Sequence, residues 1–251
     1  MSNPHRIHLI LPAFNEGANL GPLFNSFGEL PEVSSFRFHL VNDGSTDNTL
    51  DVLQQIDKQV DLKLINHTTN QGLSKTLQTG LLSAVQETGP QDIIVFMDAD
   101  NTHLPAQVPE LVKVIFNGAD IAIASRYQKG ATIEGLSNFR KSFSLVASTL
   151  FRVFLPVKGV KDFSCGFRAI KAKLITRLSP TELDQIFSLK GFACTTALLL
   201  ALTRDKSVSV QEIPMKLKYN QKRGVSKMNL KQTSFESLKL ILNEWLIRRS
   251  C

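Results

Sequence analysis

The stretch "IIVFMDADNTHLP", residues 93–105, runs five apolar side chains together and then places Asp98 and Asp100 one residue apart. Such an apolar run is typical of a strand buried on both faces of a sheet. The two carboxylates that follow it suit Mg²⁺ or Mn²⁺, which usually complete their coordination with water and a substrate's phosphates. The alternative interpretation is an Asp pair that caps a helix beginning near Pro105.

Four other apolar runs of strand length share this character, and segments with helical spacing separate them. Strands are expected at Ile7–Leu11, Phe36–Val41, Leu62–Ile65, Ile93–Met97 and Ile121–Ala124, and helices at Leu20–Phe27, Leu50–Ile56, Leu73–Val85 and Val108–Phe116. This alternation predicts an α/β fold with a mostly parallel sheet. Ligands of such sheets bind beyond the carboxyl ends of the strands, so the polar loops there are the candidate site.

After Arg126 the alternation stops. Helical spacing resumes at 136–154, 192–202 and 235–247, and a strand is expected at 208–213. The last helix is expected to set several apolar side chains on one side: Phe235, Leu238, Ile241, Leu242 and Trp245, flanked by Lys239, Arg248 and Arg249. This pattern fits a helix lying on an anionic membrane, and also one packed on its own sheet with lysines reaching solvent.

The composition, 43% hydrophobic and 20% charged, is that of an ordinary globular protein. No apolar run approaches the roughly 18 residues of a spanning helix, and the N-terminus shows no export signal. Three widely spaced cysteines argue against a disulfide framework or a zinc site. We therefore expect a single domain, 1–251, located in the cytoplasm.

The two halves of the chain differ in charge. Residues 1–125 hold 6 Lys/Arg and 14 Asp/Glu, a net of −8, whereas residues 126–251 hold 23 and 8, a net of +15, giving +7 together. A basic half indicates phosphate, nucleic acid or an anionic membrane surface, unless its charges are merely solvated. Nucleic acid is disfavoured because only Tyr127 and Tyr219 lie near the basic loops, without interleaved aromatic residues.

Two earlier loops resemble the Asp98 loop in position. In "NDGSTDNT", residues 42–49, Asp43 ends a strand and Gly44 suits a turn with positive φ; the loop is either a turn with a helix cap or a contact for a base or ribose. "PAFNEG", residues 12–17, follows the first strand in the same way. Neither glycine-rich phosphate loop is present, which disfavours dinucleotide oxidoreductases and P-loop phosphotransferases.

Several motifs in order carry a family resemblance. "LPAFNEGANL", "VNDGSTDNT", "NQGLSKTLQTG" and "MDADNTHLP" resemble the nucleotide-sugar half of glycosyltransferase family 2, which has the GT-A fold, a single Rossmann-like domain. "SRYQKGATIEGLSNFRKSFS", "VKDFSCGFRAIK" and "EIPMKLKYNQKRGVSK" resemble the branch of dolichyl-phosphate mannose synthases and related polyprenyl-phosphate glycosyltransferases. The resemblance covers most of residues 7–228. It implies that C-terminal amphipathic helices complete a basic, acceptor-binding half.

The resemblance also implies roles for individual residues. Asp98, Asp100 and Arg126 would be catalytic, with Asp98 and Asp100 holding Mg²⁺ or Mn²⁺. Nucleotide contacts would come from Pro12, Ala13, Asn15, Glu16, Asp43, Asp98 and Ala99, and acceptor contacts from Ser125, Arg126, Arg140, Arg168, Arg223 and Lys227. The chain departs from the family pattern at Asn42, at Thr102, where a Gln is usual beside the metal, and at Ala197, where a Glu is usual.

The implied reaction is metal-dependent, inverting transfer of mannose, glucose or N-acetylglucosamine from a nucleotide diphosphate sugar to a polyprenyl phosphate, by a protein peripheral at the cytoplasmic membrane face. A phosphate acceptor is favoured because "SLKGFACTT", residues 188–196, offers no acid to serve as a base, and a phosphate needs none at neutral pH. One alternative is a family 2 enzyme acting on a saccharide hydroxyl. Another is a non-catalytic protein that binds nucleotide sugars or nucleic acid.

Overall fold

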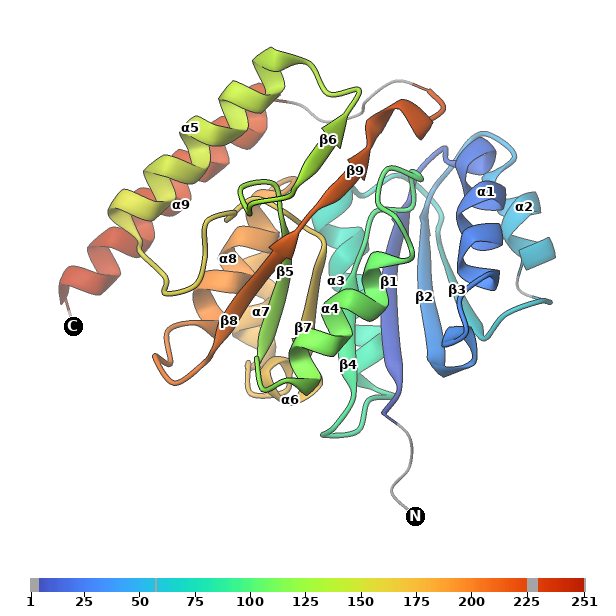
Figure 1. Ribbon diagram of the computed structural model, residues 1–251, viewed down its shortest axis with the longest axis horizontal. Helices are drawn as coiled ribbons and strands as arrows, with labels where there is room; N and C mark the ends of the chain where they lie inside the picture. The colour runs from blue at the N-terminus through green and yellow to red at the C-terminus, as the bar shows by residue number, and fades with distance from the viewer. Residues whose placement is uncertain (1–4, 57, 225–229, 251) are drawn as a thin grey trace.

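A seven-stranded sheet forms the centre of the computed structural model, which describes residues 5–56, 58–224 and 230–250. The strand order is β3-β2-β1-β4-β7-β5-β8 (Figure 1). The bounds are β1 Ile7–Ala13, β2 Phe36–Asp43, β3 Leu62–His67, β4 Ile93–Phe96, β5 Ile121–Ser125, β7 Arg168–Lys171 and β8 Val210–Pro214. All run parallel except β7, which is antiparallel to both neighbours. The predicted α/β fold with a mostly parallel sheet is confirmed.

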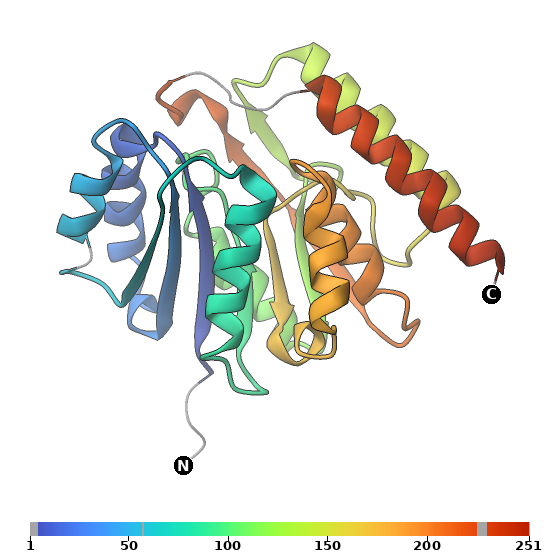
Figure 2. The ribbon, with the colours of Figure 1, turned by 180° about the vertical axis from the view of Figure 1, so that it is seen from behind.

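Helices cover both faces of the sheet. Figure 1 shows α1 (Gly17–Gly28) and α4 (Gln107–Phe116) in front, with α2 (Thr49–Ile56) beside α1. Seen from behind in Figure 2, α3 (Leu73–Val85), α7 (Pro180–Ser188) and α8 (Ala193–Leu202) cover the other face. Because both faces are covered, every residue of β4 is buried, which explains its uninterrupted apolar run.

Some elements carried no clear signal in the sequence. They are β7, the short helices α6 (Ala172–Ile175) and α7, and a separate two-stranded sheet of β6 (Thr132–Glu134) and β9 (Lys216–Lys218). An isolated bridge between His103 and Leu217 connects β9 to the loop after β4. The second sheet therefore lies over the carboxyl ends of the central strands, where ligands of parallel sheets bind.

Two long helices, α5 (Asn138–Phe154) and α9 (Leu230–Ser250), lie side by side and stand away from the central strands (Figures 1 and 2). The predicted face of α9 is partly wrong. Ile241 is buried and Trp245 packs against the core, whereas Phe235, Leu238, Leu242 and Leu246 are exposed. These four recur at spacings of three and four residues, so α9 has one apolar face toward the protein and another toward solvent. The side chains of Arg248 and Arg249 lie outside the described residues.

Two histidines pair inside the core. His8 of β1 and His39 of β2 have no exposed surface, and their rings are joined by a 3.0 Å contact between Nδ1 of His8 and Nε2 of His39. His39 Nδ1 lies 3.0 Å from Ser83 Oγ, and His8 Nε2 lies 3.5 Å from a carboxylate oxygen of Asp92. Burial lowers the pKa of His8, and burial together with the neighbouring His8 lowers the pKa of His39 to about 4.

This pair predicts acid sensitivity of the fold. Between pH 6.5 and about 4, the unfolded chain protonates His39 while the folded chain keeps it neutral, so stability falls as the pH falls. We expect the free energy of unfolding to drop by about 1–3 kcal/mol more in wild type than in His39→Gln between pH 7.5 and 5. Urea denaturation at both pH values measures it, with His5→Gln, at an exposed position, as the control. Equal losses in His39→Gln and wild type would contradict the assignment.

Candidate active site

A cavity of about 870 Å³ opens at the carboxyl ends of the parallel strands. Its walls come from the loops after β1, β2, β3, β4 and β5, from the loop between α7 and α8, and from α5 and α9. Most of the residues predicted for the site line it: Pro12, Ala13, Glu16, Asp43, Asp98, Ala99, Asp100 and Arg126. The topology therefore brings together loops that are far apart in the sequence.

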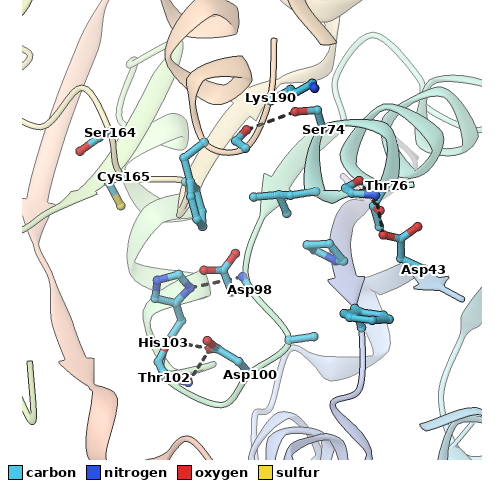
Figure 3. A pocket seen from close by; sticks show the side chains of 18 of the residues that line it. Asp43, Ser74, Thr76, Asp98, Asp100, Thr102, His103, Ser164, Cys165 and Lys190 are labelled. Atoms are coloured by element: carbon cyan, nitrogen blue, oxygen red, sulfur yellow. Dashed lines mark hydrogen bonds between the residues drawn. The ribbon is translucent and has the colours of Figure 1, made fainter. Parts of the chain in front are cut away.

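Asp98 and Asp100 lie on the loop that follows β4 (Figure 3). The Asp98 backbone N–H donates to His103 Nδ1 at 3.3 Å, and both oxygens of Asp100 accept hydrogen bonds. Within the part of the chain that the structure describes, the carboxylate of Asp98 has neither a hydrogen bond nor an ion pair. Burial, reinforced by the charge of Asp100, raises the pKa of Asp98 well above its usual range.

Asp100 is stabilised as a carboxylate by its neighbours. Its Oδ1 accepts from Thr102 Oγ1 at 2.7 Å, and its Oδ2 lies 2.6 Å from Nζ of Lys222. Burial opposes the charge, but Lys222 and then His103 outweigh it and lower the pKa of Asp100. Thr102, which stands where the family pattern has Gln, thus orients Asp100 by its hydroxyl.

His103 and Lys222 were not predicted as site residues. His103 is buried, stacks on Phe167 with ring centroids 4.8 Å apart, and holds the Asp98 backbone; burial lowers its pKa to about 4, so it is neutral at pH 7. Lys222 follows β9 in the basic segment of the second half. It lies 122 residues from Asp100 in the chain, so no local sequence pattern connects the two residues.

The Asp43 carboxylate organises the neighbouring loop. It accepts from the backbone N–H groups of Gln71 and Gly72, both at 2.9 Å, and pairs with His67. Gly44 has φ +65, and a Cβ there would lie 2.4 Å from the Thr69 carbonyl carbon, so this turn requires glycine. Asp43 still lines the cavity, where its role in binding a nucleotide stays a prediction.

Asn15 and Glu16 have structural partners. Asn15 has φ +51, and its side-chain oxygen accepts from the Thr46 backbone N–H at 2.8 Å, which ties the loops after β1 and β2 together. Asn15 is absent from the cavity lining among the described residues. Glu16 lines the cavity and accepts from Asn19 Nδ2 at 2.5 Å.

Arg126 lines the cavity and forms a bidentate pair. Its Nε and Nη2 donate to the two oxygens of Asp162 at 2.8 and 2.7 Å, and Nη2 also donates to Ser164 Oγ at 2.7 Å. Asp162 has no exposed surface, and Glu212 accepts from its backbone N–H at 2.7 Å. Asp162 raises the pKa of Arg126 further against the effect of burial, so this guanidinium stays charged and fixed in direction.

The remaining acceptor predictions are not supported by the geometry. Ser125 is fully buried, and Arg168 donates to the backbone carbonyls of Thr195 and Phe163, both at 2.6 Å, inside the core. Neither lines the cavity, nor does Arg223, whose backbone bonds to Asn19. We therefore leave these three out of the proposed site. The Arg140 side chain and Lys227 lie outside the described residues.

The acidic pair fits a hard divalent cation. Carboxylate oxygens are the ligands that Mg²⁺ and Mn²⁺ prefer. A partly buried carboxylate that lacks a partner among the described residues, such as that of Asp98, is stabilised when a cation lies beside it. Lys222 supplies one positive charge, but among the described residues its ion pair is with Asp100 and not with Asp98.

Comparison with known proteins identifies the family. The glycosyl transferase family 2 model matches residues 8–178. A dolichol-phosphate mannosyltransferase of Pyrococcus furiosus is 32% identical over 96% of the chain, which spans 64% of that relative's length. A polyprenol monophosphomannose synthase of Mycolicibacterium smegmatis is 29% identical over 97% of the chain and 88% of its own length.

A solved structure supports the fold independently. Glucosyl-3-phosphoglycerate synthase from Mycobacterium tuberculosis, in complex with Mn²⁺, UDP and glucosyl-3-phosphoglycerate, superposes with a TM-score of 0.66 at 20% identity, covering 98% of this chain and 80% of that one. This similarity confirms the GT-A architecture, and the family match extends over more than half of the chain. The chain therefore belongs to glycosyl transferase family 2.

Proposed function

We propose that the chain transfers a hexose from a nucleotide diphosphate sugar to a polyprenyl phosphate at an anionic membrane surface. The observation that carries this proposal is one cavity lined by groups of opposite charge. The acidic pair, Asp98 and Asp100, and the fixed guanidinium of Arg126 both line it, together with residues of α5 and α9. The two relatives, named for mannose transfer to dolichol or polyprenol phosphate, support the same reaction.

On the donor side, the loops after β1 and β2 would receive the nucleotide, with Asp43 and Ala13 in the wall. Asp98 and Asp100 would hold Mg²⁺ or Mn²⁺, which is consistent with the complexes of glucosyl-3-phosphoglycerate synthase with UDP and Mn²⁺ or Mg²⁺. Such an ion, when bound, neutralises the charge that develops on the leaving diphosphate. The carboxylates thereby determine where the diphosphate lies, and Lys222 adds a second positive charge near it.

On the acceptor side, Arg126 would bind the phosphate that attacks the sugar. Its Nη1 has no hydrogen-bond partner among the described residues, whereas Nε and Nη2 are occupied by Asp162 and Ser164. Apart from Asp98 and Asp100, the described lining offers carboxylates only at Glu16 and Asp43, on the donor side. A phosphate acceptor needs no base, since it is largely ionised at neutral pH.

The apolar helices support contact with a membrane. Of the exposed large apolar side chains in the described part, all but Leu82 and Phe116 lie on α5 or α9: Leu145, Val146, Val153, Phe154, Phe235, Leu238, Leu242 and Leu246. Residues of both helices, including Ala147 and Ser237, also line the cavity, which links the apolar surface to the site. None of the described helices has the length and apolarity to cross a membrane. The cytoplasmic location stays a prediction.

Product analysis tests the function. Purified chain would be incubated with Mn²⁺ or Mg²⁺, a short polyprenyl phosphate, and in turn GDP-mannose, UDP-glucose and UDP-N-acetylglucosamine. We expect a hexosyl lipid phosphate from one donor and none when polyprenol replaces the phosphate. Transfer to a saccharide hydroxyl, with no lipid product from any donor, would contradict the proposal.

Membrane contact makes a separate prediction. Leu238→Asp combined with Leu242→Asp should weaken binding to anionic phospholipid vesicles by about tenfold or more, because each exposed leucine contributes roughly 1.5–3 kcal/mol when buried. Vesicle co-sedimentation measures the binding. Leu82→Asp with Phe116→Asp is the matched control, since both are exposed on other helices. Unchanged binding of the α9 variant would exclude this surface.

A further inference from the structure

Lys222 is held against the acidic pair and is not a free surface lysine. Its Nζ lies 2.6 Å from Asp100 Oδ2, and only 10% of its side chain is exposed. An ion pair this sheltered from water is screened less than a surface pair. A metal ion bound by Asp100 would therefore have to lie close to the Lys222 ammonium.

The backbone fixes Lys222 from both sides. Before it, β9 bonds to the acidic loop, because the Lys218 backbone N–H donates to the Thr102 carbonyl at 3.0 Å. After it, Arg223 donates its backbone N–H to Asn19 Oδ1 at 2.8 Å and accepts from Asn19 Nδ2 at 3.0 Å. Gly135 packs so closely that a Cβ there would lie 2.7 Å from the Asn220 backbone nitrogen. The backbone that carries Lys222 is thus anchored beside the acidic loop.

Building on the proposed function, we propose that Lys222 is a resident counter-ion of the metal subsite, so that a divalent cation binds strongly only together with a nucleoside diphosphate. A metal ion held by Asp98 and Asp100 would lie within a few ångströms of the ammonium and be repelled by it. The negative charges of a diphosphate offset this repulsion, because they attract both cations. Metal and nucleotide should therefore strengthen each other's binding by the same factor.

Calorimetric titration of Mn²⁺ into the full chain tests this, first alone and then with a saturating nucleoside diphosphate, GDP or UDP. Lys222→Met should lower the Kd for Mn²⁺ alone by about tenfold, within the usual range of coupling between two ligands. The decrease in the Kd for Mn²⁺ caused by Lys222→Met should be smaller when the nucleotide is present. Lys222→Arg, which keeps the cation, should resemble wild type.

Lys216→Met is the matched control. Lys216 lies on β9, shortly before Lys222, but pairs with Glu110 at the surface, at 3.0 Å, so this variant removes one positive charge without touching Asp100 and should leave the Kd unchanged. Circular dichroism would show whether the Lys222→Met variant is folded. Unchanged or weaker Mn²⁺ binding by the folded variant would overturn the inference about Lys222 and leave the proposed function standing. Absence of Mn²⁺ binding in wild type and variant, even with nucleotide, would overturn it together with the proposed metal site.

Discussion

Replacing Asp100 with Asn should reduce hexose transfer by at least roughly 10³-fold, because the variant loses a carboxylate proposed to hold the cation that neutralises the leaving diphosphate. The Asp100 carboxylate faces the cavity, where Thr102 and Lys222 orient its two oxygens. Asn keeps the size of the side chain and an oxygen for the Thr102 hydroxyl, so we expect the fold to persist. Initial rates of hexosyl lipid formation at saturating donor and acceptor would measure the loss.

Asp120→Asn provides the comparison for that result. Asp120 also forms an ion pair, with Lys171 Nζ at 2.9 Å, but it does not line the cavity. Its replacement should cost some stability and little activity, which separates loss of a carboxylate in general from loss of this one. If Asp100→Asn transferred hexose at the wild-type rate in the presence of a chelator, the metal role of Asp100 would be ruled out.

The parallel part of the sheet was predictable because its strands are recognisable without their partners. With helices on both faces, β4 is a continuous apolar run and β1 is one apart from His8, and the helices between them keep their own spacing. β7 has no such signature. It is four residues long, includes Arg168, and pairs Ile93 with Lys171, a long-range contact that no local pattern encodes.

The candidate site was predictable to the same extent. The carboxyl ends of parallel strands share an edge, so Asp43, Asp98 and Asp100 could be expected near one another. A motif does not show which way a side chain points: Arg168 carries the expected charge, yet its strand directs it into the core toward carbonyls. Lys222 was not predicted for the site at all. It lies in a basic segment where it resembles any solvated lysine, and only the fold places it beside Asp100.

We propose two roles for Arg126, binding of the acceptor phosphate and neutralisation of Asp162, and Arg126→Met should affect both. Acceptor use, measured as kcat/KM for polyprenyl phosphate, should fall by roughly 10²–10³-fold, because removing one partner of a sheltered charge pair weakens binding by about 2–5 kcal/mol. Stability should fall by about 3–5 kcal/mol, because Asp162, with no exposed surface, is left as a buried charge without its partner. On its own this variant therefore cannot separate acceptor binding from folding.

The double variant Arg126→Met with Asp162→Asn separates them. Once Asp162 is neutral, no unpaired carboxylate is buried, so the free energy of unfolding in urea should recover most of its loss. Transfer should not recover, since the guanidinium proposed to bind the acceptor is still missing. Acceptor use would be measured by titrating polyprenyl phosphate at saturating donor, and the rate at which water hydrolyses the donor would be measured beside it. A loss of acceptor use with an unchanged rate of hydrolysis would confine the defect to the acceptor side. Activity that returned in step with stability would show that Arg126 serves only to neutralise Asp162.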